Sequence, residues 1–487
     1  MRAGFRNLRG KRALVMGFGR FGGGRGAAEY LLDQGAQVTV TDLSDVASLE
    51  QSMALLKDEH RAAITWRLGS HDSADFAAAD LVVANPAVPA NNRYLAAARE
   101  AGAWVTTDIE LFLRSTTMRL ALITGTQGKS STAKILAGLL DAAGVEVHLG
   151  GNIGASLLST LGRDHAANAV AVVELSSYQL EGLPLDKDLA KATTVGVTNL
   201  MEDHIDRHGS LESYHAVKAR IGELLAPGGR AIASQGDVGY LRENGPKTAA
   251  WGTFAVHGPS EHARAREERT TAKDPESTPL DMELDEGNFL AWGTKLASLD
   301  DFPLPGVFQQ TNALAAIGMA LALGVPRGSI PTGLAKLRGL PHRAEELGTV
   351  TNCGSDGTLT IRIIDNAVST TPDSTQSVLE ALAGPVTLLV GGRSKGQNLE
   401  RLARCAKRNT AFALCFGEAA AELQAAFVQA GLAAHAFATM EEAICRGTTD
   451  LASPTLLFSP ACSSFDAFSN FQQRAIAFRA ALPERSK

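Results

Sequence analysis

The chain has 487 residues, of which 45% are hydrophobic and 20% charged, with a formal net charge of −6. This composition is typical of a globular protein, and the length predicts about three domains. The net negative charge argues against a general affinity for nucleic acid or for an anionic membrane. No apolar run reaches the roughly 18 residues that a membrane span needs. We therefore expect neither partner.

The cysteines are few and lie only in the last third of the chain, with no C-x-x-C pair. This scatter predicts reduced core thiols in a cytosolic protein rather than disulfides or a zinc site. The five positions are Cys353, Cys405, Cys415, Cys445 and Cys462.

The first third begins with a nucleotide-binding pattern. A short apolar strand at 12–17 leads into Gly17-x-Gly19-x-x-Gly22, a helix at 27–34 and a strand at 37–41 that ends in Asp42. This is the dinucleotide fingerprint, in which the acid binds a ribose hydroxyl. By itself it leaves open a nicotinamide-dependent dehydrogenase, or a layer that binds nothing. A third strand at 81–84, a helix at 94–101 and a strand at 104–107 follow, so we expect a parallel sheet.

A second phosphate-binding pattern begins at the apolar strand 120–124. A glycine turn, a lysine and two serines follow, and a helix is predicted over 133–140. Backbone N–H groups and a helix N-terminus bind anions, so Lys129 would reach the outer phosphates and Ser130 or Ser131 would bind Mg²⁺. The pattern is shorter than the full Walker motif, because Ile123 stands where that motif has its first glycine.

Polar residues also follow the next predicted strands. Asn152 lies in the glycine turn 150–154, Glu174 ends the strand 169–173, and His204 lies in the loop 199–208 after the strand 192–198. Ligands bind at the carboxyl ends of strands in parallel sheets, and a carboxylate there suits Mg²⁺. Lys218, on the helix predicted over 211–225, would by itself be interpreted as a solvated surface lysine.

These segments together resemble the Mur ligase family. The resemblance rests on Gly-Thr-Gln-Gly-Lys-Ser-Ser at 125–131, Gly-Gly-Asn-Ile-Gly at 150–154, Glu-Leu-Ser-Ser-Tyr-Gln-Leu at 174–180 and Asn-Leu-Met-Glu-Asp-His-Ile-Asp-Arg at 199–207. The tail 459–471 is similar to the branch that adds D-glutamate. The resemblance implies an ATP-dependent ligase that joins D-glutamate to UDP-N-acetylmuramoyl-L-alanine through an acyl phosphate, in peptidoglycan precursor synthesis. It also implies a cytoplasmic enzyme, expected to be a monomer, with ATP and Mg²⁺ as cofactors and small molecules as its only partners.

The same resemblance implies a role for particular residues. Lys129, His204 and Lys218 would be catalytic, and Lys218 occupies the position of a carbamylated lysine. Metal ligands would be Ser130, Glu174, His204 and the modified Lys218. ATP would be bound by Gly125, Thr126, Gln127, Gly128, Lys129, Ser130, Ser131, Asn312, Arg343 and Asp365. The UDP substrate would be bound by Arg20, Phe21, Asp42, Asn85 and Asn152, and the amino acid by Thr370, Lys395, Ser464 and Phe471.

The expected fold is α/β with three domains. A Rossmann-like domain at 1–117 would bind the UDP substrate, a P-loop ATPase-like domain at 118–340 would bind ATP, and a Rossmann-like domain at 341–487 would bind the amino acid. Strands are predicted at 359–364, 386–392, 412–417 and 455–459, a hairpin over 282–296 and a helix over 312–323. The charged stretch 260–279 has no apolar period and is predicted to be a mobile surface segment. Just before the helix predicted over 312–323, Phe308 and Gln309 replace the pair of residues that the family usually has there.

Other functions remain open at this point. A dehydrogenase explains only residues 17–42 and leaves Lys129, Glu174 and His204 without a role. Another ligase of the same fold, of the folylpolyglutamate synthase kind, would differ in the first domain and in the tail 464–471. A non-catalytic nucleotide-binding module would retain its function without Lys129.

Overall fold

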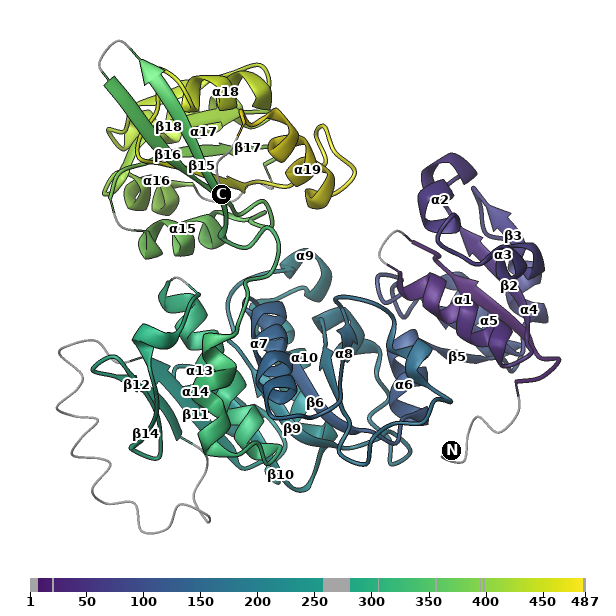
Figure 1. Cartoon of the computed structure of the whole chain (residues 1–487). Coiled ribbons are helices and arrows are strands. Elements are labelled where there is room, and N and C mark those ends of the chain that lie inside the picture. The colour runs from purple at the N-terminus through teal and green to yellow at the C-terminus, as the bar shows by residue number, and fades with distance from the viewer. Residues whose placement is uncertain are drawn as a thin grey trace. The chain divides into compact units, whose positions relative to one another are not determined.

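The structure is a computed structural model of the chain, and it describes residues 8–19, 22–256, 281–304, 306–354, 357–382, 384–394, 396 and 399–484. Arg20, Phe21, Lys395 and the segment 260–279 lie outside the described residues. The chain divides into two compact units, Met1–Phe302 with Thr311–Lys336, and Pro303–Gln310 with Leu337–Lys487. Its described strands form three sheets, one within each predicted domain (Figure 1). The domain boundaries themselves stay predictions.

The first sheet is parallel and has the strand order β3-β2-β1-β4-β5. Its central strand β1 is buried from Ala13 to Met16, as an apolar run covered on both faces requires. The strands are β1 (Arg12–Met16), β2 (Gln37–Asp42), β3 (Thr65–Leu68), β4 (Leu81–Ala84) and β5 (Trp104–Thr106). The helices are α1 (Gly23–Asp33), α2 (Val46–Met53), α3 (Asp58–Ala63), α4 (Ser73–Ala78), α5 (Arg93–Glu100) and α6 (Asp108–Ser115).

The second sheet has the order β14-β13-β12-β11-β10-β9-β6-β8-β7. It is parallel from β7 to β12 and antiparallel from β12 to β14. The strands are β6 (Arg119–Thr124), β7 (Val147–Gly151), β8 (Val170–Glu174), β9 (Ala192–Val197), β10 (Leu225–Ser234), β11 (Trp251–Val256), β12 (Asp281–Asp285), β13 (Asn288–Ala291) and β14 (Thr294–Ser298). The helices are α7 (Lys129–Ala142), α8 (Ser177–Gly182), α9 (Ile205–His208), α10 (Leu211–Ala219), α11 (Val238–Asn244), α13 (Val307–Ala322) and α14 (Ile330–Ala335), with the 3₁₀ turns η1 (Leu157–Thr160) and η2 (Arg220–Leu224).

The order of this second sheet sets the position of the site. Strand β6 lies between β8 and β9, and all three run parallel. The residues that follow β6, β8 and β9 therefore meet at one edge of the sheet, where ligands bind in such folds. They are the glycine loop at 125, Glu174 and the loop that begins at Asn199.

The third sheet has the order β15-β16-β20-β17-β18-β19, and only the pair β15–β16 is antiparallel. The strands are β15 (Glu345–Gly354), β16 (Gly357–Asp365), β17 (Val386–Gly391), β18 (Thr410–Phe416), β19 (Ala434–Ala436) and β20 (Thr455–Ala461). The helices are α15 (Pro372–Ala381), α16 (Glu400–Ala406), α17 (Ala420–Gln429), α18 (Met440–Gly447) and α19 (Phe471–Ala481). Two apolar clusters of buried residues pack on this sheet.

Several local predictions were wrong. The strand at 81–84 is the fourth of its sheet, because Thr65–Leu68 forms an edge strand too short and too polar to be recognised. The predicted hairpin is a three-stranded meander, since β12, β13 and β14 pair in succession. The helix predicted over 211–225 is α-helical only to Ala219, and its last part is the 3₁₀ turn η2.

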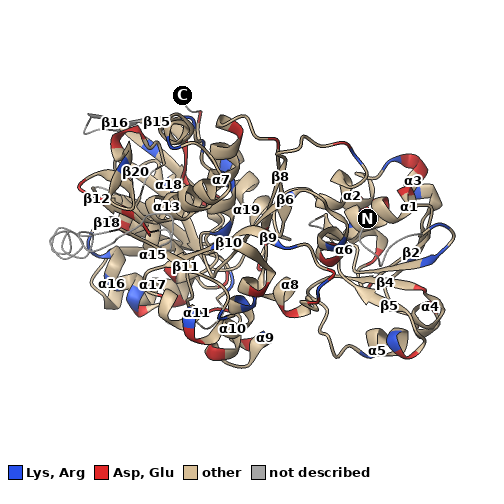
Figure 2. Cartoon of the chain, turned by 90° about the horizontal axis from the view of Figure 1, so that it is seen from below, with Lys and Arg blue, Asp and Glu red and all other residues tan. Residues whose placement is uncertain are grey.

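One thiol also differs from the prediction, because Cys445 is exposed on α18 while Cys405, Cys415 and Cys462 are buried. Both signs of charge are distributed over the elements without a long stretch of one sign (Figure 2). Among the described residues, no helix is long and apolar enough to cross a membrane.

Candidate active site

The glycine loop between β6 and α7 has the geometry of an anion-binding turn. Gly128 precedes α7 with φ of 80°, in the left-handed region that only glycine enters at low cost. A Cβ atom there would lie 2.2 Å from Asn312 Oδ1. Both the left-handed backbone conformation and the lack of space therefore disfavour a side chain at this position. Lys129 Nζ donates to the carbonyl oxygens of Gly125 and Thr126, each at 2.9 Å. The lysine is therefore held over its own loop.

A second segment, at the end of β9, braces this loop. Gln127 N donates to Asn199 Oδ1 at 2.9 Å, and Asn199 Nδ2 donates back to Gln127 O at 3.1 Å. Thr198 Oγ1 also donates to Gln127 O, at 2.5 Å. Thr126 Oγ1 donates to Met201 O at 3.2 Å. These bonds fix the loop conformation in advance, which reduces the entropy lost when a ligand binds.

Glu174, at the end of β8, is 1% exposed. Its Oε1 atom accepts a hydrogen bond of 3.0 Å from Asn152 Nδ2. Its Oε2 atom is buried and has no hydrogen-bond partner among the described residues. Gly151 makes the approach of β7 possible, because a Cβ atom there would lie 2.2 Å from the Glu174 carbonyl oxygen. An unsatisfied buried carboxylate oxygen is costly unless a proton or cation meets it, so this atom marks a ligand position.

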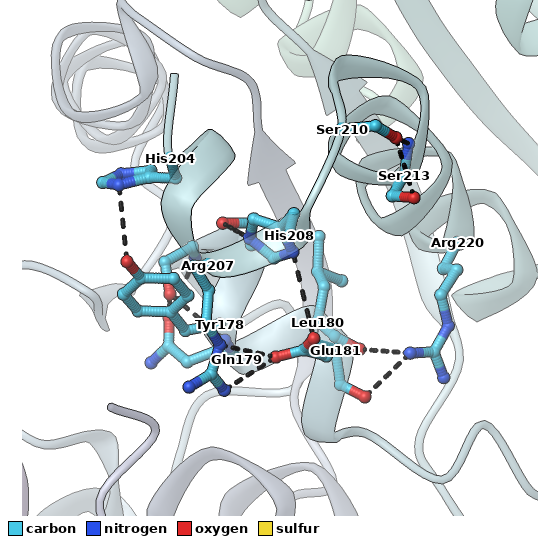
Figure 3. Close-up of polar contacts among 12 residues, drawn as sticks. Tyr178, Gln179, Leu180, Glu181, His204, Arg207, His208, Ser210, Ser213 and Arg220 are labelled. Atoms are coloured by element: carbon cyan, nitrogen blue, oxygen red, sulfur yellow. Dashed lines mark hydrogen bonds and ion pairs between the residues drawn. The ribbon is translucent and has the colours of Figure 1, made fainter. Parts of the chain in front are cut away.

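The histidine loop after β9 is anchored to α8, as Figure 3 shows. Arg207 Nη2 donates to Glu181 Oε2 at 2.8 Å, and His208 Nε2 lies 3.0 Å from Ser177 Oγ. His204 has φ of 50° at the start of the short helix α9, and its Nδ1 lies 3.4 Å from the hydroxyl of Tyr178. The anchored loop and the contact with Tyr178 thus orient the His204 ring, although the side chain of His204 is partly exposed.

Lys218 is buried on α10, with 1% exposure, so the interpretation as a solvated surface lysine is wrong. Its Nζ atom donates to Gly125 O at 2.7 Å and lies 4.5 Å from the centre of the Tyr214 ring. Burial, together with the nearby charge of Lys129, lowers the pKa of Lys218 to about 6, although Asp203 and Glu174 oppose this shift. The sequence pattern of this helix could not predict the burial of Lys218, because the burial depends on the packing of α10 under the glycine loop, which is a tertiary contact.

The electrostatic interactions show which predicted residues the structure brings together. Lys218 interacts with Lys129 and Glu174. His204 interacts with Lys129 and Lys218, and these charges, after burial, help to lower the pKa of His204 despite the opposing effect of Asp203. Lys129, Glu174, His204 and Lys218 thus share one neighbourhood at the carboxyl edge of the second sheet.

Two of the residues predicted for the UDP substrate, Asp42 and Asn85, lie at the carboxyl ends of β2 and β4 in the first sheet, whereas Asn152 follows β7 in the second sheet. Asp42 Oδ2 accepts from Gly19 N at 3.1 Å and Oδ1 accepts from Ser44 N at 2.8 Å, so this carboxylate organises the fingerprint loop. Asn85 Oδ1 accepts from Ala87 N at 3.0 Å. A small pocket beside the fingerprint is lined by Gly17, Gly23, Gly24, Asn85 and Asp108, among others.

In the second unit, the geometry gives Asp365 a structural role. The residue is fully buried, and its Oδ2 lies 2.7 Å from His342 Nδ1 and accepts from Arg479 Nε at 2.8 Å. Its Oδ1 accepts from Ala367 N at 2.9 Å. This network gives Asp365 a structural role, and its predicted contact with ATP stays a prediction.

Of the residues predicted for the amino acid, the three that the structure describes are Thr370, Ser464 and Phe471, in the third-sheet domain. Thr370 is partly exposed, Ser464 is buried and Phe471 begins α19, where its ring lies 6.4 Å from that of His342. No pattern in the sequence pointed to Arg474, which is fully buried and donates to the carbonyl oxygen of Cys462 at 3.1 Å and to that of Gly391 at 3.3 Å. This guanidinium ties together the loops that follow two strands.

Two family models match the chain, a Mur ligase middle domain over residues 123–320 and a Mur ligase MurD-like, N-terminal domain over residues 11–107. A UDP-N-acetylmuramoylalanine--D-glutamate ligase from Roseiflexus sp. (strain RS-1) is 33% identical, over 97% of this chain and 98% of its own. The protein of the same name from Chromobacterium violaceum is 32% identical, over 95% of each chain.

The chain belongs to the Mur ligase family. The fold agrees: UDP-N-acetylmuramate-alanine ligase MurC from Thermotoga maritima aligns with a TM-score of 0.58 and 16% identity over 96% of this chain and 98% of its own. A murein peptide ligase from Psychrobacter arcticus 273-4 aligns with a TM-score of 0.54 and 16% identity, over 98% of this chain and 100% of its own. The predicted three-domain α/β architecture is confirmed.

Mur ligase family membership implies ATP with a divalent cation, and the residues present fit Mg²⁺. Glu174 offers its buried, unpartnered Oε2, an oxygen ligand of the hard type that Mg²⁺ prefers. Ser130 is buried in the first turn of α7, beside the phosphate loop. No role was predicted from the sequence for Thr198 and Asn199, which support the glycine loop, although Asn199 begins one of the family motifs.

Proposed function

We propose that this protein is an ATP-dependent ligase that joins D-glutamate to UDP-N-acetylmuramoyl-L-alanine, with release of ADP and phosphate. The observation that carries the proposal is the braced glycine loop, to which both Lys129 and Lys218 donate, beside the unpartnered oxygen of Glu174. A dinucleotide-binding sheet alone would not need these groups. The names of the relatives supply the acceptor and the amino acid.

The chemistry follows from charge and position. The acceptor carboxylate attacks the γ-phosphorus of ATP, and an acyl phosphate and ADP result. The amine of D-glutamate then attacks the acyl carbon, phosphate leaves, and the amine proton is released. Lys129 and the N–H groups of the loop lower the energy of the charged transferring phosphoryl group. No protein nucleophile is required, so the protein acts by orientation and by exclusion of water.

The ATP residues that we propose are Gly125, Thr126, Gln127, Gly128, Lys129, Ser130, Ser131, Asn312 and Arg343. Arg20, Phe21, Asp42, Asn85 and Asn152 would bind the UDP substrate, and Thr370, Lys395, Ser464 and Phe471 the amino acid. Magnesium would be held by Ser130, Glu174, His204 and Lys218, and when bound it would neutralise phosphate charge.

Lys218 would take part as a carbamate. Its amine is buried and its pKa lies near 6, so most of it is neutral at pH 7 and able to attack CO₂. The new N–C bond yields a carbamate and one proton, and it converts a cation into an anionic oxygen ligand. A carbamate signal in ¹³C NMR with labelled bicarbonate, present in the wild type and absent from Lys218→Ala, would support this role; a wild type without that signal would contradict it.

Phosphate release tests the function directly. Purified protein is supplied with ATP, Mg²⁺ and UDP-N-acetylmuramoyl-L-alanine, together with each member of a panel of L- and D-amino acids. We expect release with D-glutamate and a product of the corresponding mass. Release with a different amino acid would overturn the assigned substrate, and no release with any of them would overturn the ligase.

A matched pair of lysines on α7 provides the control. Lys129→Ala removes the ammonium held over the phosphate loop, and we expect turnover to fall by roughly 10²-fold or more. Lys134 lies on the same helix but is exposed, so Lys134→Ala should leave turnover unchanged. Equal activity of both variants would contradict the role of the loop.

A further inference from the structure

Three side chains of metal-ligand type meet at the opposite end of β7 from the active site. Glu146 directly precedes the strand, His148 lies within it, and His165 lies between η1 and β8. His148 Nε2 is 2.7 Å from Glu146 Oε1, and His165 Nδ1 is 2.9 Å from the same oxygen. The three ligand atoms lie within 4.8 Å of one another. We call Glu146, His148 and His165 the edge cluster.

Two backbone contacts orient the edge cluster from outside. His165 Nε2 lies 2.9 Å from Thr160 O, and Ala166 N donates to Glu146 Oε2 at 2.8 Å. A metal-binding histidine commonly donates its second ring N–H to a backbone carbonyl, which fixes the other nitrogen toward the ion. Here that contact directs Nδ1 of His165 toward Glu146. The side chains are partly exposed, 25% for His148 and 13% for His165, so an ion from solvent reaches them.

We propose that the edge cluster binds one divalent transition-metal ion of the Zn²⁺ class. Two imidazole nitrogens and one carboxylate oxygen suit such borderline ions, whereas Mg²⁺ and Ca²⁺ prefer oxygen ligands throughout. Three protein ligands leave room for water at the remaining position. The two nitrogens already lie at the same carboxylate oxygen, so small side-chain movements bring all three to a central ion.

A second cluster of metal-ligand side chains differs from the edge cluster, because a charged side chain already occupies its centre. His342, Glu345 and Asp365 also lie within 4.8 Å of one another. There, however, Arg479 donates to Glu345 Oε2 at 2.5 Å and to Asp365 Oδ2 at 2.8 Å. The guanidinium of Arg479 thus occupies the position that a metal ion would take. No comparable contact between an arginine or lysine and the edge cluster occurs in the part of the chain that the structure describes.

An ion at the edge cluster would act on stability rather than on the reaction. Gly151, at the carboxyl end of β7, pairs with Glu174, and Glu146 lies five residues earlier, roughly 17 Å away along an extended strand. The ion would link the amino end of β7 to the segment that follows η1, and helices α1 and α6 both contact η1. This inference does not depend on the proposed ligase activity.

Cobalt is the probe that we choose for the test, because Co²⁺ absorbs visible light when nitrogen and oxygen atoms bind it. The full-length protein is titrated with Co²⁺ in a large excess of Mg²⁺, which competes with Co²⁺ for the active site. We expect one Co²⁺ per chain, displacement by Zn²⁺ and a rise in the thermal midpoint with Zn²⁺. The double variant His148→Gln/His165→Gln should lose the absorption and the rise, with ligase turnover retained.

Two further variants keep the result interpretable. His435→Gln removes an exposed histidine on β19 and should leave Co²⁺ binding unchanged. Glu146→Gln retains the size of the side chain and should weaken binding at least tenfold, even if the double variant fails to fold. Absence of Co²⁺ absorption in the wild type would overturn the proposal, as would an unchanged Co²⁺ affinity in Glu146→Gln.

Discussion

The charge state of Lys218 depends on where its side chain is placed. Its amine lies beneath the glycine loop, donates to Gly125 O and is within the field of Lys129. Burial disfavours the ammonium, so the pKa falls to about 6. A neutral amine beside a phosphate loop is a reactive group. The free energy that its burial costs lowers the free energy of unfolding of the protein.

That cost gives a pH-dependent prediction. Between pH 6 and about 10, the unfolded chain binds a proton at Lys218 that most folded molecules lack, so the free energy of unfolding contributed by this residue rises with pH. The slope would approach about 1.4 kcal/mol per pH unit, the value for one bound proton. Urea unfolding in CO₂-free buffers from pH 6 to pH 9 measures it, and Lys218→Met should show a flatter profile. Parallel profiles would contradict the low pKa.

At the scale of elements, the start of α7 depends on one glycine. Gly128→Ala would force a Cβ atom to within 2.2 Å of Asn312 Oδ1 in addition to the cost of a left-handed backbone. We expect the KM for ATP to rise at least tenfold, because either the loop or α13 must shift. Gly144, just beyond the end of α7, is the matched control: its φ is 75°, but a Cβ atom there meets nothing within 4 Å. Gly144→Ala should cost about 1 kcal/mol of stability and leave the KM for ATP unchanged.

The C-terminal helix α19 is fastened to the third sheet by Arg479. The guanidinium donates to the fully buried Asp365 and to Glu345. Arg479→Met leaves a buried carboxylate without its main partner, so we expect the free energy of unfolding to fall by about 2–4 kcal/mol in urea titrations. The exposed pair of Arg446, on α18, and Asp450, just beyond the end of α18, is the control, and Arg446→Met should leave the free energy of unfolding nearly unchanged. Similar losses in both variants would refute a special role for Asp365.

At the scale of the whole molecule, the Mur ligase family and its three-domain architecture are confirmed. The two nucleotide-binding patterns of the sequence belong to different sheets, the first to β1 and α1 and the second to β6 and α7. A dehydrogenase would use only the first. Separate ligands should therefore stabilise the protein independently of each other.

Thermal unfolding with each ligand tests this division. A ligand at a hundred times its Kd adds about 2.7 kcal/mol of stability, which corresponds to a midpoint rise of roughly 3 °C in a protein of this size. We expect such a rise with Mg–ATP and with UDP-N-acetylmuramoyl-L-alanine, and none with NAD. A rise with NAD alone would favour the dehydrogenase.

Much of the site could be predicted because its parts are local. A buried strand, a glycine turn and a helix that begins with a lysine are consecutive in the sequence, and backbone sterics alone bring them into one anion-binding turn. The parallel order of strands then collects the polar residues that end β6, β8 and β9 at one edge. The individual roles of these residues stay predictions.

The family, the alternation of strands and helices, and the phosphate loop could be predicted from the sequence, because they depend on periodicity and on motifs of neighbouring residues. The burial of Lys218, the internal network around Asp365 and the contact between Glu146 and His165 became visible only in the folded chain. Each of these depends on a partner from a distant segment. Burial and pairing set the charge and the free energy of a side chain, and they do not exist until the chain has folded.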